Sequence, residues 1–299
     1  MADVNLTTAS ELEERQDRQS RRNNSYKTRF YVGSTIINAI LLILLVLTVV
    51  PFIYMISSAF KPNSEIFGTP LTLIPTHFTL ENMSALLTNF PFARWAFNTA
   101  TVAILGTITS LVLGSMAGFA FAKYDFPFKN VLFTVLLATM LIPGQVTLVP
   151  QFEVIRFLHW FNTYQALIVP RAVSAFTIFL MRQYTLSVPN ELLDSARVDG
   201  ATEFNIWWRI VVPLVRPGLA VVAILSFTAL WNDYLWPLVV TTDPSMFVMN
   251  LGISSLVGPY DYQYGILLSG AVLAALPLII IFFFFQKQFL QGLTEGALK

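Results

Sequence analysis

The polar segment 185–213 carries the residues whose types and spacing are best suited to chemistry with a partner. Pro189 fits the first turn of a helix, where its missing N–H would be unpaired anyway. Glu191 follows in that turn, where a carboxylate complements the helix dipole. Gly200 can end this helix in a left-handed conformation, and Thr202 can cap a second helix. The spacing therefore predicts two short helices joined at a sharp bend.

Small and charged residues make this segment a candidate for docking. Ser195 and Ala196 allow a partner to approach closely, and Asp194 and Asp199 belong to a charged rim beside them. A short helix with a small apolar face and such a rim fits a groove on another protein. It also fits the surface of a bilayer, as an amphipathic helix. The residue types alone favour neither alternative.

The sequence lacks the motifs of hydrolytic and metal-binding enzymes. There is no cysteine, and the two histidines, His77 and His159, are predicted to lie outside membrane spans. Neither His-Glu-x-x-His nor Gly-x-Ser-x-Gly occurs, and there is no phosphate-binding loop. We therefore expect a chain that is not an enzyme, binds no metal or cofactor, and does not itself hydrolyse ATP.

The composition indicates an integral membrane protein. Of 299 residues, 55% are apolar and only 12% are charged, and the mean hydropathy is +0.64. The charges gather in short clusters between long apolar runs, whereas a soluble domain needs a charged surface.

The apolar runs predict an all-α fold with six transmembrane helices. About 20 apolar residues cross the hydrocarbon core as a helix, which satisfies every backbone donor internally. Within the third run, Pro143 and Gly144 predict a kinked or broken helix. The predicted spans lie near Tyr31–Ile56, Ala96–Ala122, Val131–Val149, Tyr164–Tyr184, Ile210–Trp236 and Tyr264–Phe285.

The positions of lysine and arginine predict that both termini are cytoplasmic. With this orientation most of the 18 basic residues lie on the inner side. The chain then divides into a cytoplasmic tail, residues 1–29, a membrane domain, 30–291, and a second cytoplasmic tail, 292–299. The segment 185–213 becomes a long inner loop.

That inner loop resembles the cytoplasmic loop of permease subunits of binding-protein-dependent ABC importers. The family pattern is Glu-Ala-Ala, three residues, Gly, then a spacer and Ile-x-Leu-Pro. This sequence has Asp-Ser-Ala at 194–196, then Gly200, and Ile-Val-Val-Pro ending at Pro213. It departs from the pattern with Asp for Glu, Ser for Ala and Val for Leu, and these changes preserve charge or size.

Three further stretches narrow the resemblance to the carbohydrate-importing branch. They are Trp-Asn-Asp-Tyr-Leu-Trp-Pro at 231–237, Gly-Leu-Thr-Glu-Gly-Ala-Leu-Lys at 292–299, and Phe-Leu-Met-Arg-Gln at 179–183. Together they resemble the maltose-type (MalG-like) permease subunits with six helices. The similarity runs from about Val32 to Lys299.

The resemblance implies a pore subunit with several partners in a bacterial or archaeal cytoplasmic (inner) membrane. These are a second permease subunit, two ATPase subunits that bind ATP and Mg, an extracytoplasmic solute-binding protein and membrane lipid, with no nucleic acid. The loop residues that would couple to an ATPase are Glu191, Asp194, Ser195, Ala196, Asp199, Gly200 and Pro213. The tail 292–299 would reach between the ATPases, and the outer turn Gly258-Pro259-Tyr260 would contact the binding protein.

Polar groups in or near the spans are candidates for the solute pathway: Asn98, Gln145, Trp231, Asn232 and Asp233. Polar groups at membrane depth usually face the bundle interior. Interhelical hydrogen bonds are the alternative for Asn98 and Gln145, and an interfacial belt is the alternative for Trp231. Arg171 is expected near the outer interface, paired with a carboxylate.

Two other transport functions compete with sugar import. The first is an ABC permease for a non-sugar solute such as glycerol phosphate, an amino acid or a peptide, whose loop would look similar. The second is a secondary transporter, which usually has an acidic ion site near the midplane. No Asp or Glu lies deep in a predicted span, which disfavours the second alternative.

Overall fold

The computed structural model describes residues 35–70, 72–256 and 263–297, with the backbone alone from residue 287 onward. Helices and turns account for these residues, with no β-strand among them. The chain divides into two compact units, Met1–Ser57 and Ser58–Lys299. A helix from Thr35 to Ala59 is long and apolar enough to cross a membrane. It confirms the first predicted span from residue 35 onward; residues 31–34 lie outside the described part.

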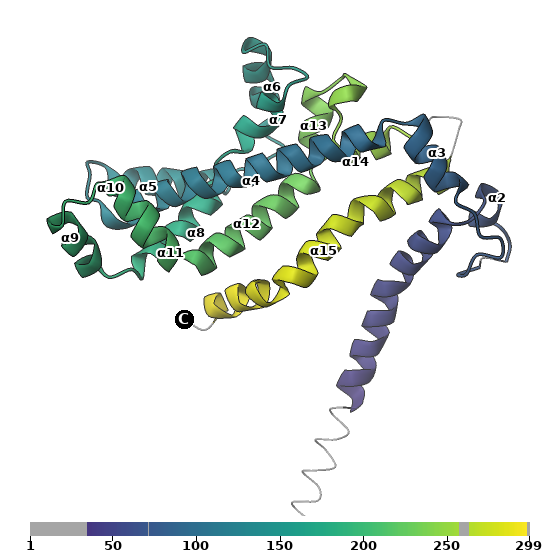
Figure 1. Cartoon of the computed structure of the whole chain (residues 1–299), viewed down its shortest axis with the longest axis horizontal. Helices are drawn as coiled ribbons and strands as arrows, with labels where there is room; N and C mark the ends of the chain where they lie inside the picture. Colours follow the sequence, from purple (N-terminus) through teal and green to yellow (C-terminus); the bar gives the residue numbers. More distant parts are fainter. Residues whose placement is uncertain (1–34, 71, 257–262, 298–299) are drawn as a thin grey trace, which may run out of the picture. The chain divides into compact units, whose positions relative to one another are not determined.

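The second unit is organised around α4 (Phe92–Lys123), which contains the second predicted span (Figure 1). Its 32 residues are about 48 Å long. α4 packs mainly against α8 (Ala175–Leu186) and α12 (Arg216–Trp231). At Gly118 an added Cβ would lie 2.7 Å from the Cβ of Met181. Glycine there lets two helix backbones approach closely, as small residues do in membrane bundles.

The last helix, α15 (Tyr264–Ala297), contains the sixth predicted span and packs against α12 and α3 (Glu81–Asn89). Its part from Tyr264 to Gln286 is long and apolar enough to cross a membrane. The helix continues to Ala297, so most of the predicted tail 292–299 is helical and directly continues α15.

The fourth and fifth predicted spans are each bent. α7 (Tyr164–Ile168) and η1 (Val169–Arg171) meet α8 at 45°. The helical segment Glu203–Leu214 meets α12 at 84°. The fifth predicted span, Ile210–Trp236, is therefore not one straight helix: α12 begins after the bend, with Pro217 in its first turn, and ends at Trp231 rather than at Trp236. Proline suits that turn because no intrahelical donor is needed there.

The third predicted span, Val131–Val149, is wrong as a single helix. α5 (Lys129–Thr139) ends well before Pro143, and α6 (Leu148–Phe157) begins after a run of turns. Proline removes a backbone donor and restricts the residue before it, which ends α5. The predicted break at this proline is confirmed. The described residues thus contain three unbroken candidate spans, two bent ones, and the shorter apolar helix α5.

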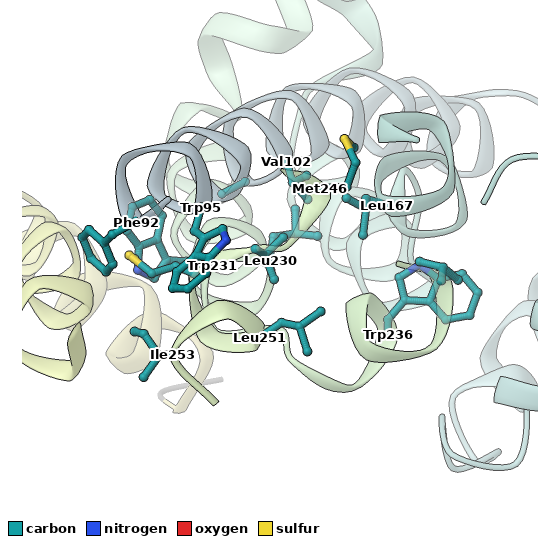
Figure 2. Packing of buried hydrophobic residues seen from close by; sticks show 14 of the residues in the cluster. Phe92, Trp95, Val102, Leu167, Leu230, Trp231, Trp236, Met246, Leu251 and Ile253 are labelled. Carbon is teal, nitrogen blue, oxygen red and sulfur yellow. The ribbon is translucent and has the colours of Figure 1, made fainter. Parts of the chain in front are cut away.

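Short helices surround the end of α4 that holds its first residues. They are α2 (Asn63–Ile66), α13 (Leu235–Val240), η3 (Pro244–Met246) and α14 (Met249–Ser254). The apolar side chains of α13, η3 and α14 share a buried cluster with α4 and α12, in which Trp95, Trp231 and Trp236 are the largest members (Figure 2). This cluster anchors the segments that follow α12 to the body of the unit.

Candidate functional site

The predicted first helix of the loop 185–213 is α9 (Asn190–Val198), and its two ends are defined by local chemistry. Pro189 is the residue before its first turn, with a φ of −62° that is typical of proline. Gly200 has a φ of +80°, and its N–H donates to the Arg197 carbonyl at 3.0 Å. The next N–H, of Ala201, donates to the Ala196 carbonyl at 2.9 Å. This pair of bonds around a left-handed glycine is a Schellman motif, so the predicted helix end is confirmed.

The second short helix, α10 (Glu203–Ile206), begins where the sequence predicts. The Thr202 hydroxyl accepts a hydrogen bond from the Asn205 N–H at 3.3 Å. A π-helical turn, η2 (Trp207–Val211), and α11 (Val212–Leu214) continue to the 84° bend. Pro213 explains the wide turn, because a proline ring displaces the carbonyl four residues earlier.

An ionic network joins α9, α10 and the end of α4. The Arg197 guanidinium contacts Asp194 Oδ1 through Nη1 and Glu203 Oε1 through Nε, each at 2.8 Å. The Tyr124 hydroxyl donates to the other oxygen of Glu203. Hydrogen bonds to Glu203 and Asp194 raise the pKa of Arg197 above its ordinary value. Burial and the Glu203 carboxylate raise the pKa of Tyr124 to about 12. The hydrogen bond from Arg197 lowers the pKa of Glu203, so at neutral pH Tyr124 is the donor and Glu203 the ionised acceptor.

A second set of contacts fixes the start of α9 to α4. Lys123, the last residue of α4, donates through Nζ to the Val188 carbonyl and, at 2.8 Å, to the Asn190 side chain. Leu193 is buried in a cluster with Phe119 of α4 and with residues of α8, η2 and α12. The two short helices and the end of α4 are therefore held as one unit.

The exposed surface of α9 and of the segment that follows it combines acidic and apolar groups. Glu191, Asp194, Ser195 and Asp199 are exposed, and Val198 is 88% exposed. The large side chains of Leu192, Phe204 and Trp208 are exposed as well. Ala196 differs from the expectation, because it packs inward against the cluster around Leu193. The surface can bind an apolar groove with a basic rim.

A polar cavity lies among the breaks in the bundle. It measures about 330 Å³ and is lined by Gly144, Gln145, Thr147, Leu148, Gln151, Pro170, Arg171, Asp233 and Leu235. Arg171 Nη2 lies 3.2 Å from Asp233 Oδ2, which confirms that Arg171 pairs with a carboxylate. Of the predicted pathway residues, the structure brings Gln145 and Asp233 together here.

Comparison with known proteins supplies the family. Residues 110–295 match the family described as binding-protein-dependent transport system inner membrane component. The chain belongs to this family. It is thus an integral component of the inner membrane and a permease subunit of an ABC transporter.

Relatives of this permease include proteins with different solutes in their names. The arabinooligosaccharides transport system permease protein AraQ of Halalkalibacterium halodurans is 39% identical over 256 residues, which cover 85% of this chain and 92% of the relative. The sn-glycerol-3-phosphate transport system permease protein UgpE of Yersinia pestis is 30% identical over 273 residues, 88% of this chain and 97% of the relative.

A solved structure agrees with the fold of the permease. A chain of a bacterial ABC transporter involved in the import of the acidic polysaccharide alginate superposes with a TM-score of 0.77 at 23% identity. The match covers 84% of this permease and 95% of that chain. At this identity the likeness concerns the fold alone.

Asn98 of the permease does not occupy the position expected of a pathway residue. Its side chain is fully buried. The amide donates to the carbonyls of Ser245 and Phe247, each at 2.9 Å, and accepts from the Tyr164 hydroxyl at 2.7 Å. Its hydrogen bonds hold the segment that contains η3 against α4. Asn98 therefore has the structural role that was the alternative to a place in the solute pathway.

Two more predicted pathway residues turn away from the cavity. Trp231 is buried, stacks on Phe227 with ring centroids 5.4 Å apart, and donates to the Ala274 carbonyl at 3.0 Å. It therefore cannot stack on a solute in this structure. Asn232 is exposed, but its amide returns to the Thr228 carbonyl at 3.0 Å. The predicted outer turn Gly258-Pro259-Tyr260 lies outside the described residues.

Proposed function

We propose that the permease forms half of the membrane pathway of an ATP-driven importer for a sugar or sugar derivative. A second permease subunit completes the pathway, two ATPase subunits hydrolyse ATP, and an extracytoplasmic binding protein delivers the solute. Both termini and the loop 185–213 face the cytoplasm. The chain itself binds no nucleotide and no metal, so it has no ATPase activity when purified alone.

The observation that carries this proposal is the joined unit of α9, α10 and the end of α4. Arg197 binds carboxylates of both short helices, and Lys123 ties the start of α9 to α4. A partner that moves α9 therefore moves α4, which packs along α8 and α12. Figure 1 shows α9 and α10 at one end of α4 and α13 and α14 toward the other. This arrangement suits the transmission of a motion across the bundle.

The energy for that motion comes from different affinities of an ATPase for the loop in its two nucleotide states. Glu191, Asp194, Ser195, Asp199 and Gly200 form the exposed rim that would contact the ATPase. Ala196 and Pro213 shape the loop from within, since Ala196 packs inward and Pro213 precedes the bend. We assign all seven to coupling.

A charge reversal on this rim tests the coupling role. In the assembled importer, Asp194→Lys breaks the ion pair with Arg197 and places two cations three residues apart. We expect solute uptake to fall at least tenfold while the ATPase subunits still hydrolyse ATP. The matched control is Asp125→Lys, which makes the same charge change at a fully exposed residue paired with Lys129. Wild-type uptake by Asp194→Lys, or equal loss in the control, would contradict the coupling role.

The similarity to the arabinooligosaccharide permease favours a sugar as the solute. That relative is 39% identical in sequence to this permease, compared with 30% for UgpE. Glycerol phosphate or another non-sugar solute is the second candidate, because UgpE is named for that anion. ATP-dependent uptake by proteoliposomes, compared for neutral oligosaccharides and for glycerol 3-phosphate, separates the two.

A further inference from the structure

Three interruptions of the helices meet around Arg171. They are residues 140–147 between α5 and α6, residues 172–174 before α8, and residues 232–234 between α12 and α13. Non-helical backbone at membrane depth occurs where it is buried in protein or lines a water-filled cavity. Two cavities are found here, of about 330 Å³ and about 520 Å³, and Pro170 and Arg171 line both. The two cavities are therefore neighbours that share one cationic side chain.

The smaller cavity, which Asp233 lines, lies far from the coupling loop along the bundle. α12 begins at Arg216, beside the loop, and its 16 residues extend about 24 Å. Asp233 follows two residues after α12 ends. The length of α12, about 24 Å, approaches the roughly 30 Å thickness of the hydrocarbon core. A solute delivered from the outer side would thus meet Asp233 early in its passage.

The charges in the smaller cavity are balanced. Arg171 and Asp233 form an ion pair of zero net charge, and their side chains are 41% and 16% exposed. A guanidinium only donates hydrogen bonds and a carboxylate only accepts them. A hydroxyl does both, so vicinal hydroxyls of a solute can bind the two groups at once. A phosphate or carboxylate of a solute would bind Arg171 but be repelled by Asp233.

The larger cavity adds hydroxyl groups and apolar surface. Thr177 Oγ1 lies 2.8 Å from Ser174 Oγ and 3.3 Å from Ser110 Oγ, and Ser226 Oγ lies 3.5 Å from Ser110 Oγ. The hydroxyls come from α4, α8, α12 and the residue before α8, and they line the cavity beside Phe176 and other apolar side chains. Hydroxyl groups beside apolar surface match the alternating polar edges and apolar faces of an uncharged, hydroxyl-bearing solute.

We propose that the joined cavities are a solute-contact site of this chain, and that Asp233 neutralises Arg171 so that the site favours uncharged, hydroxyl-bearing solutes over anions. This inference rests on the proposed function, because it takes the bundle to be a solute pathway. It assigns a specificity-determining role to Asp233 and a solute-binding role to Arg171.

The natural absence of cysteine allows a direct test. Gln145→Cys places one thiol in the smaller cavity of the assembled importer. Its modification rate is measured with two methanethiosulfonate reagents, the anionic sulfonatoethyl and the cationic trimethylammonioethyl compound. A unit charge about 8 Å away, at an effective dielectric constant of about 30, changes the local concentration of a singly charged reagent about tenfold.

Adding Asp233→Asn should raise the anionic-to-cationic rate ratio at least tenfold, and adding Arg171→Gln should lower it by a similar factor. Combining both substitutions should restore the original ratio, which a misfolded bundle would not do. The control thiol, Ser64→Cys, lies exposed in α2, outside both cavities, and its ratio should not respond to either change.

The proposed site would be overturned if the thiol at position 145 does not react. It would also be overturned if Asp233→Asn leaves the anionic-to-cationic rate ratio unchanged. These rates do not depend on coupling to ATP hydrolysis. Loss of the charge response while Asp194→Lys still uncouples uptake would therefore reject the site and leave the proposed function standing. The reverse result would reject the coupling role alone.

Discussion

Replacing Gly200 with alanine tests the turn that links α9 to α10. The φ of Gly200 is +80°, a left-handed conformation that costs an L-residue about 1–2 kcal/mol. A Cβ at this position would find no other atom within 4 Å, so the cost arises from the backbone and not from a clash. We take about 1 kcal/mol, which changes the opening equilibrium of the turn about fivefold.

Hydrogen exchange in the assembled importer measures that equilibrium. The Ala201 N–H, which donates to the Ala196 carbonyl, should exchange about fivefold faster in Gly200→Ala. Gly200→Asn should have a smaller effect, because asparagine tolerates the left-handed region.

A matched control separates backbone conformation from the added methyl group. Gly144 also has no atom within 4 Å of an added Cβ, but its φ is not in the left-handed region. Gly144→Ala should therefore leave the exchange of Ala201 unchanged and should not loosen its own turn. Unchanged exchange in Gly200→Ala, or equal loosening by Gly144→Ala around residue 144, would refute the reasoning.

Three further predictions concern packing and charge. Asn98→Ala should destabilise the permease by about 1–3 kcal/mol, because buried carbonyls lose their donors; an unchanged thermal midpoint would contradict this. Gly118→Ala should lower the midpoint more than Gly114→Ala, because the added Cβ meets backbone atoms 2.8 Å and 2.9 Å away at position 118 but a side-chain methyl of Thr177 first at position 114. The Thr76 N–H donates to the Glu65 carboxylate and lowers the pKa of Glu65. Protection of the Thr76 N–H from hydrogen exchange should therefore be full above the ordinary glutamate pKa of about 4.3, and should fall as the pH drops through the lower pKa of Glu65 in the folded protein. Glu65→Gln should remove this pH dependence.

The sequence alone predicts the loop 185–213 well because its signals act over a few residues. Gly200 ends α9, Thr202 caps α10, and Pro189 precedes the first turn, all through backbone geometry within the segment itself. The apolar runs likewise locate the helices, since a span requires only a long stretch without charge. Pro143 marked a break, although the length of that break was not predictable from one residue.

Long-range packing decided what sequence reasoning missed. Arg171 and Asp233 are 62 positions apart, and their pairing depends on where two separate helix breaks lie in the folded bundle. The polarity of Asn98 was visible in the sequence, but its burial against the segment around Ser245 was not. Local conformation follows from neighbouring residues, whereas burial and ion pairing depend on the closure of long loops, which only the tertiary structure specifies.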